Sequence, residues 1–173
     1  MRLGVMCSGN GSNFENIVRS VTKHEVVLMV HNTKVCGAAM RAEKLGIPHC
    51  RIKAKHEDEM IKLFKAWDVD LIILAGYMRV IKNPEKFPAP IINVHPSLLP
   101  KFKGLYAVEQ ALESGDKKTG CTVHYVNEEL DGGEIIEQSV VHISPEDTVE
   151  SLTHRIQRAE YRLLPLVINQ FAI

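Results

Sequence analysis

Short apolar segments alternate with amphipathic ones through the first half of the chain. The apolar segments are four to seven residues long and rich in Val, Ile and Leu, which is typical of strands: Arg2–Cys7, Glu25–His31, Pro48–Ile52, Val69–Ala75 and Ile91–Val94. The segments between the first four of them repeat their apolar positions with the period of a helix. This alternation predicts an α/β, doubly wound fold with a mostly parallel sheet and helices on both faces.

The second half of the chain has a different order of elements. We expect a helix over Leu105–Ser114, two longer strands over Cys121–Val126 and Glu134–His142, and a final helix from about Thr148. This half is predicted to extend the sheet with mixed strand directions. Pro165 lacks an N–H and is expected to kink or split the final helix.

The length and the absence of a linker or repeat predict a single domain, residues 1–173. The 21 basic and 21 acidic side chains balance, which disfavours nucleic acid as a partner. No apolar run is long enough to cross a membrane and the N-terminus does not read as a signal peptide, so we expect a cytoplasmic protein. We also expect a monomer or a weak homodimer.

The four cysteines are scattered and form no metal-binding or disulfide pattern: Cys7, Cys36, Cys50 and Cys121. We expect them to be reduced and mostly buried, and we expect no metal site.

A glycine-rich segment, Ser8-Gly9-Asn10-Gly11-Ser12-Asn13, joins the first strand to a helix that is expected to start at about Asn13. Backbone N–H groups at a helix N-terminus carry partial positive charge and suit a phosphate group. The segment lacks the third glycine of a dinucleotide fingerprint and the Gly-Lys-Ser/Thr of a P-loop. An equally good interpretation is a plain turn in which Ser12 or Asn13 caps the helix.

The segment Asn93-Val94-His95-Pro96 ends a buried strand with two polar side chains that are two residues apart. They project to the same side of a strand, where an amide and an imidazole could both donate hydrogen bonds to an oxyanion. A carboxylate beside the imidazole would favour its charged form, and Asp131 in the Leu-Asp-Gly-Gly turn is the candidate. Sequence spacing does not place Asp131 beside His95, and the turn could be only a turn. No nucleophile-elbow pattern occurs, so direct transfer between two bound substrates is favoured over a covalent intermediate.

Four motifs together resemble the phosphoribosylglycinamide formyltransferases of purine synthesis, in order and spacing, across nearly the whole chain. They are SGNGSN near the start, LAGYMRVI at 74–81, NVHPSLLPKFKG at 93–104 and GCTVHYVNEELDGGEII at 120–136. The motifs at 93–104 and 120–136 are also shared with formyltransferases that act on initiator tRNA and amino sugars. The SGNGSN motif favours the phosphoribosylglycinamide enzymes, because the other two groups lack it. The chain ends at Phe171-Ala172-Ile173, earlier than typical members, and its segment Lys53–Glu59 offers no clear contact to a folate glutamate tail.

The resemblance implies a role for each motif. Catalysis would fall to Asn93, His95 and Asp131. The acceptor would be bound by Gly11, Ser12 and Asn13 at its phosphate and by Gln157 and Glu160 on the last helix. The pterin of the folate would be bordered by Met78, Arg79, Val80, Ile81 and Asn93. His124 matches a histidine near the acceptor, although a buried structural histidine is as plausible, and Gln157, Glu160 and Arg79 could be ordinary surface residues.

The implied activity is transfer of a formyl group from 10-formyltetrahydrofolate to the amine of glycinamide ribonucleotide, with small-molecule partners only and no metal. The N-terminal half would bind the acceptor, and the C-terminal half would bind folate and catalyse the reaction. One alternative is a hydrolase that deformylates folate, for which a phosphate-binding segment has no use. The other is a non-catalytic phosphate sensor, which leaves Asn93, His95 and Asp131 unexplained.

Overall fold

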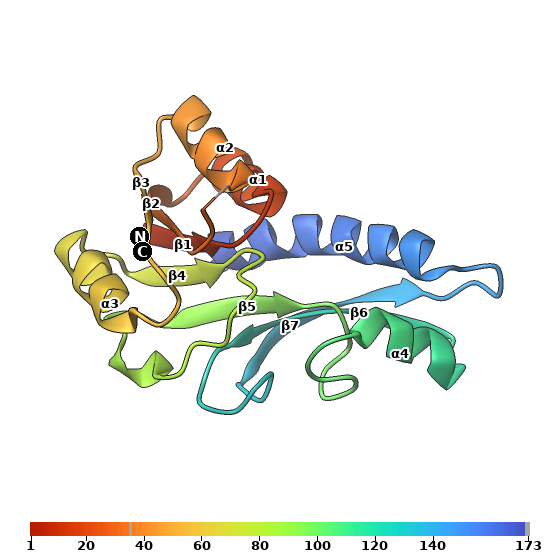
Figure 1. Ribbon diagram of the computed structural model, residues 1–173. Helices are drawn as coiled ribbons and strands as arrows, with labels where there is room; N and C mark the ends of the chain where they lie inside the picture. Colours follow the sequence, from red (N-terminus) through yellow and green to blue (C-terminus); the bar gives the residue numbers. More distant parts are fainter. Residues whose placement is uncertain (35, 172–173) are drawn as a thin grey trace.

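Seven strands form one sheet in a computed structural model that describes residues 1–34 and 36–171 (Figure 1). The strands are β1 (Arg2–Cys7), β2 (Glu25–His31), β3 (His49–Arg51), β4 (Leu71–Leu74), β5 (Ile91–His95), β6 (Lys118–Tyr125) and β7 (Ile135–His142). Their order across the sheet is β3-β2-β1-β4-β5-β6-β7. The first five run parallel, whereas β6 and β7 are antiparallel additions. The predicted mostly parallel sheet with a mixed C-terminal part is confirmed.

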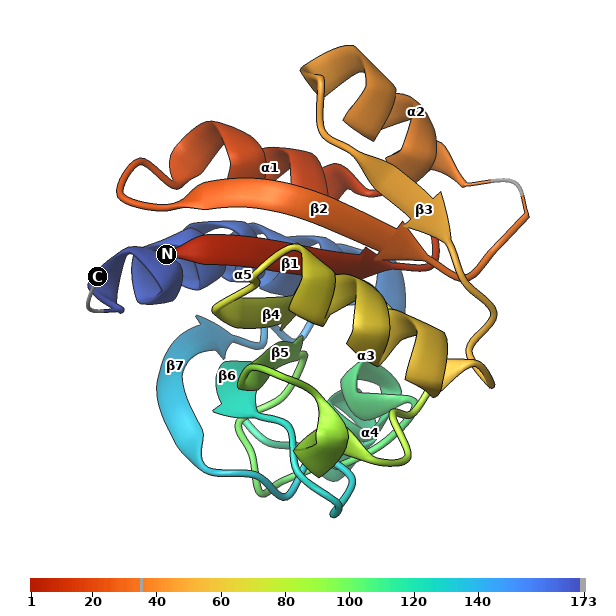
Figure 2. The same cartoon turned by 90° about the vertical axis from the view of Figure 1, so that its left-hand side faces the viewer.

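Helices cover both faces of this sheet. They are α1 (Ser12–Ser20), α2 (Gly37–Leu45), α3 (Glu57–Ala66), α4 (Ala107–Ser114), α5 (Val149–Gln170) and the 3₁₀ turn η1 (Pro84–Lys86). One apolar core joins α1, α2, α4 and α5 to the sheet, and a second joins α3, together with Phe87 after η1, to the opposite face. Figure 2 shows α1 and α5 side by side along one face, with α3 on the other. None of the helices in the described residues has the length and apolarity that a membrane span requires.

The order in which strands are added to the sheet changes direction after β3, because the chain returns to place β4 on the other side of β1. The strands β2 and β3 lie on one side of β1, and β4 and β5 lie on the other. Parallel doubly wound sheets bind ligands beyond the carboxyl ends of the strands at such a switch point. The segments that follow β1 and β4 meet there.

The last helix begins where expected but does not break at its proline. Thr148 caps α5 with a reciprocal pair of hydrogen bonds to Ser151, and the helix then continues through Pro165 to Gln170. The expected split is therefore wrong. Pro165 is buried within the core, where packing on the sheet holds the helix on both sides of it. Three of the cysteines, Cys7, Cys36 and Cys121, are buried and Cys50 is exposed, as the composition indicated.

Candidate active site

The side chains of Asn93 and His95 line one cavity of about 440 Å³. Both lie on β5, and the neighbouring residue Ile91 on the same face belongs to the core beneath α3. The antiparallel pairing of β5 with β6 sets His124 opposite Asn93 and Thr122 opposite His95. Strand pairing therefore brings a second imidazole to the same face of the sheet, which no local pattern in the sequence could reveal.

Asp131 reaches this face from the far end of the neighbouring strand. Because β6 runs antiparallel to β5, the segment after β6 leaves the sheet where β5 begins, and the Val126 N–H bonds to the Ile91 carbonyl. Residues 126–134 then fold back over the face of the sheet. Asp131 itself adopts a left-handed backbone conformation with φ of 51°. The motif that contains Asp131 thus leaves the sheet from an antiparallel strand, and not from the carboxyl end of β5, where His95 lies.

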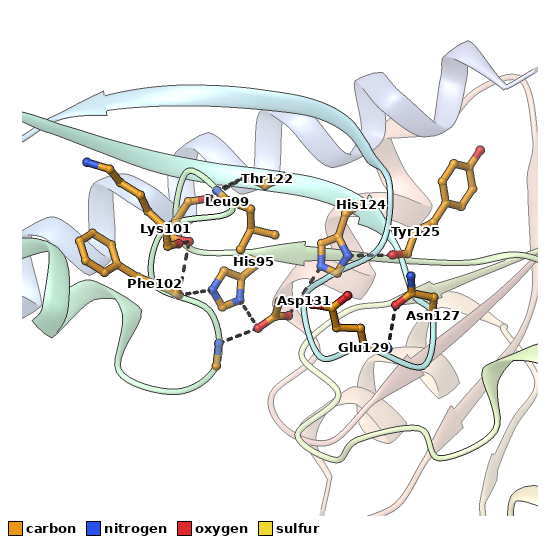
Figure 3. A network of polar contacts seen from close by, with 12 residues as sticks. His95, Leu99, Lys101, Phe102, Thr122, His124, Tyr125, Asn127, Glu129 and Asp131 are labelled. Atoms are coloured by element: carbon orange, nitrogen blue, oxygen red, sulfur yellow. Dashed lines mark hydrogen bonds and ion pairs between the residues drawn. The ribbon is translucent and has the colours of Figure 1, made fainter.

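His95, which is 6% exposed, has contacts at both ring nitrogens (Figure 3). Its Nε2 lies 2.8 Å from the Phe102 carbonyl oxygen, which can only accept, so Nε2 carries a proton. Its Nδ1 lies 3.5 Å from Asp131 Oδ2. The same Oδ2 accepts a hydrogen bond from the Gly104 N–H at 2.7 Å. The predicted proximity of Asp131 and His95 is present, and a segment after β5 braces both residues through its backbone.

Phe102 and Gly104 are contributors that sequence reasoning missed. They act through main-chain atoms, so their side-chain identity carries no signal of this role. A carbonyl that fixes the Nε2 proton leaves Nδ1 without a proton in the neutral ring. His95 can therefore donate a hydrogen bond from Nδ1 only as an imidazolium.

His124 lies on the other side of Asp131 (Figure 3). Its Nδ1 donates to the Tyr125 carbonyl at 2.9 Å, while Nε2 is buried, unpaired and 3.8 Å from Asp131 Oδ1. Burial lowers the pKa of His124, although the Tyr125 carbonyl and Asp131 act in the opposite direction. A neutral ring with its proton on Nδ1 presents a lone pair at Nε2. The face between His124 and Asp131 thus holds two acceptors and no donor.

The wall of the cavity opposite Asp131 is formed by the segment after β4. The predicted pterin-pocket residues Met78, Arg79, Val80 and Ile81 all line the same cavity as Asn93, His95, His124 and Asp131. Met78 is 73% exposed and Val80 67% exposed, so the mouth of the cavity offers uncovered apolar surface. The buried carboxylate of Glu57 holds this segment by accepting hydrogen bonds from the N–H groups of Lys82 and Asn83.

The glycine-rich segment after β1 forms a turn that only glycine can make. Gly11 has φ of 77°, and a Cβ on it would lie 2.5 Å from Ala38 on α2. Gly11 is also the N-cap of α1, and no side chain caps that helix. The alternative in which Ser12 or Asn13 caps it is therefore wrong. The first turn of α1 keeps N–H groups that its own cap does not bind, as an anion site requires.

The glycine-rich segment and the segment after β4 contact one another through Ser8. Its N–H donates to the Gly76 carbonyl at 3.1 Å, and its hydroxyl accepts from the Met78 N–H at 2.8 Å and donates to Asn32 Oδ1 at 2.6 Å. The glycine-rich segment and the wall of the cavity are thus joined at the switch point of the sheet.

Gln157 and Glu160 do not line the cavity that contains His95. They lie on α5, which packs beside α1 and hence beside the glycine-rich segment (Figure 2). Glu160 is half-buried, and burial raises its carboxyl pKa to about 8. A carboxyl in that state can donate a hydrogen bond at neutral pH, which an ordinary glutamate cannot.

Comparison with known proteins identifies a family whose members are similar to this chain. The sequence model described as "Formyl transferase" matches residues 1–168. The phosphoribosylglycinamide formyltransferase of Haemophilus influenzae is 36% identical, over 98% of this chain and 86% of that protein. The trifunctional purine biosynthetic protein adenosine-3 of Drosophila melanogaster is 39% identical, over 99% of this chain, which spans 14% of that protein.

Solved structures agree with the sequence comparisons. Glycinamide ribonucleotide transformylase 1 from Symbiobacterium toebii superposes with a TM-score of 0.92 at 36% identity, covering 98% of this chain and 86% of that one. Phosphoribosylglycinamide formyltransferase from Bacillus halodurans gives a TM-score of 0.91 at 38% identity, covering 98% and 94%.

Proposed function

Because this chain belongs to the formyl transferase family, we propose that it transfers a formyl group from 10-formyltetrahydrofolate to the amine of 5'-phosphoribosylglycinamide (glycinamide ribonucleotide) in de novo purine biosynthesis. The observation that carries the proposal is the meeting of Asn93, His95 and Asp131 in a cavity bordered by residues 78–81. The names of relatives that span most of this chain support the choice of acceptor.

The size and the lining of the cavity support a folate as its ligand. A volume of about 440 Å³ lies within the range of small-ligand sites, and Val80, Ile81 and Leu130 supply apolar lining. The backbone and side chain of Arg79 add polar groups at the same wall. The formyl carbon would lie against Asn93 and His95, with the acceptor amine approaching from the side of the glycine-rich segment.

The reaction forms a bond between the acceptor nitrogen and the formyl carbon and breaks the bond from that carbon to the folate N10. Attack places negative charge on the formyl oxygen. The Asn93 amide and the charged form of His95 can donate hydrogen bonds to this oxyanion, which lowers the barrier for the tetrahedral intermediate. Holding both substrates in line supplies a further large share of the rate.

The attacking amine must lose a proton, and the folate nitrogen must gain one. Asp131 Oδ1 and His124 Nε2 form the pair of acceptors on that side of the site, 3.8 Å apart. A proton arriving there, directly or through a bound water, can be held by either acceptor, and it can then pass to N10. The side chains of this chain thus provide the proton path without a covalent intermediate.

The decisive experiment compares folate turnover with and without acceptor. Purified protein should convert 10-formyltetrahydrofolate to tetrahydrofolate only when glycinamide ribonucleotide is present, as followed by absorbance. Steady turnover without acceptor would instead identify a hydrolase, and saturable binding of glycinamide ribonucleotide without any turnover would identify a sensor.

A further inference from the structure

Tyr161 on α5 contacts the glycine-rich segment, 149 residues away in the chain. Its phenol oxygen lies 2.5 Å from Ser12 Oγ, and its main-chain carbonyl accepts a hydrogen bond from the Asn16 side-chain amide at 2.7 Å. Both contacts join α5 to the first turns of α1. No motif in the sequence singled out Tyr161.

Pro165 explains why the Tyr161 carbonyl is free for this contact. In an α-helix the carbonyl of residue 161 would accept from the N–H of residue 165, and proline has none. The released carbonyl bonds to Asn16 instead. The proline inside α5 thus replaces one helical hydrogen bond with an attachment to α1, and this attachment fixes the position of the Tyr161 ring above Ser12.

We propose that Tyr161 is a positioning residue for the acceptor phosphate and acts through the Ser12 hydroxyl. The proposal rests on the proposed function in that Ser12 binds the phosphate of glycinamide ribonucleotide. Ser12 is the first residue of α1, at the helix end whose N–H groups can bind an anion.

The hydroxyl protons of Ser12 and Tyr161 determine which group can donate a hydrogen bond to a phosphate. The two hydroxyls carry two protons, and their mutual hydrogen bond uses one of them. A phenol is the stronger donor, so Tyr161 donates to Ser12 Oγ and leaves the Ser12 proton for a phosphate oxygen. A hydroxyl that accepts one hydrogen bond donates a stronger one, and the contact also holds Ser12 in a single rotamer.

The test is Tyr161→Phe, which keeps the ring and removes only the hydroxyl. The dissociation constant of inorganic phosphate, measured by titration calorimetry, should rise about 10-fold. The KM for glycinamide ribonucleotide should rise by a similar factor, while kcat and the KM for 10-formyltetrahydrofolate should not change. The matched control is Tyr106→Phe, because Tyr106 is 71% exposed and should alter neither constant.

A double-mutant cycle separates this role from a general effect on folding. In a Ser12→Ala background, Tyr161→Phe should cause no further loss of phosphate affinity. The same 10-fold loss in both backgrounds would overturn the proposal, as would an unchanged dissociation constant in the single variant. Phosphate binding is independent of the reaction. A wild-type protein that binds phosphate, responds to Tyr161→Phe and yet transfers no formyl group would therefore support this inference and refute the proposed activity.

Discussion

The imidazole of His95 is held by a carbonyl on one nitrogen and a carboxylate near the other, so its orientation is set before any substrate arrives. In the proposed mechanism, replacing His95 with alanine removes a hydrogen-bond donor to the developing oxyanion. We expect His95→Ala to lower kcat at least 100-fold. Folate binding, measured by fluorescence titration, should change little because the apolar wall at residues 78–81 is untouched.

Loss of the folded state in His95→Ala, seen by circular dichroism, would contradict this prediction and assign His95 a structural role. His95→Gln provides a second variant that retains a polar side chain beside Phe102. It should fold like the wild type and share most of the loss in kcat.

Glu160 predicts a pH dependence of stability. Burial raises its carboxyl pKa from 4.5 to about 8, so the folded protein holds the proton more tightly than the unfolded chain. This contribution to stability is complete below pH 4.5 and is lost as the pH rises towards 8. Glu160→Gln should therefore match the wild type at pH 4.5 and exceed it at pH 8.5 by on the order of 2 kcal/mol.

Urea unfolding of the two proteins at both pH values measures that difference. A free-energy difference between wild type and Glu160→Gln that is the same at both pH values would show that Glu160 ionises normally. Stabilisation without Glu160 would also mean that the wild-type residue is retained at a cost to folding, which is common for groups that serve a site.

At the level of single residues, the sequence predicted which side chains contribute to the site better than it predicted which main-chain atoms do. Asn93 and His95 could be paired because two residues apart on a strand share a face. Asp131 was a candidate because its residue type completes the chemistry and because its motif resembles that of the family. His124 was matched only through that resemblance, and its place beside Asn93 needed the register of β5 on β6. Tyr161 needed the packing of α5 on α1. Phe102 and Gly104 lie in the motif at 93–104, but the roles of their carbonyl and N–H could not be predicted because both act through main-chain atoms.

The path of the segment 126–134 depends on a glycine that lets the backbone lie close to β6. A Cβ on Gly133 would lie 1.7 Å from the Tyr125 carbonyl oxygen, so Gly133→Ala must push the segment away from β6. Asp131 would then move relative to His95. We expect kcat to fall at least 10-fold and the melting temperature to drop, because displacements near 1 Å are costly in a preorganised site.

Gly132→Ala is the matched control for that variant. The three atoms nearest to a Cβ there all belong to the Glu129 side chain, which can rotate away. It should keep most of the turnover. Equal losses in both variants would show that the segment is sensitive to any added side chain and that Gly133 has no special part in its path.

Element types could be predicted from the sequence because apolar periodicity differs between strands and helices. Boundaries moved by a few residues: β6 begins at Lys118 rather than Cys121, and α4 begins at Ala107 rather than Leu105. Pro165 was misjudged because its missing N–H was counted only as a loss to the helix. The N-cap of α1 was misjudged because Gly11 caps it through its backbone conformation.

The molecule as a whole offers chemistry based on hydrogen bonds and charge. Within residues 1–34 and 36–171, no three His, Cys, Asp or Glu side chains are grouped so that they could hold a metal ion. We therefore expect prolonged dialysis against EDTA to leave kcat and both KM values unchanged. A loss of turnover that zinc or magnesium restores would contradict this expectation.

Topology at this scale followed from the sequence because strands joined by helices pair in parallel with few alternatives. The direction of β6 was harder to foresee, since it depends on how residues 96–117 cross the end of the sheet. The antiparallel direction of β6 decides where Asp131 enters the site. The fold class could therefore be predicted from the sequence, whereas the assembly of the site could not.

The hydroxyl of Ser8 connects three separate segments of the chain. It forms hydrogen bonds with Asn32 and with the Met78 N–H, and the backbone of Ser8 continues into the glycine-rich turn. If the two segments bind the two substrates as proposed, a substitution of Ser8 should change the binding of both. A substitution that is tolerated at this position must therefore be compatible with both binding sites.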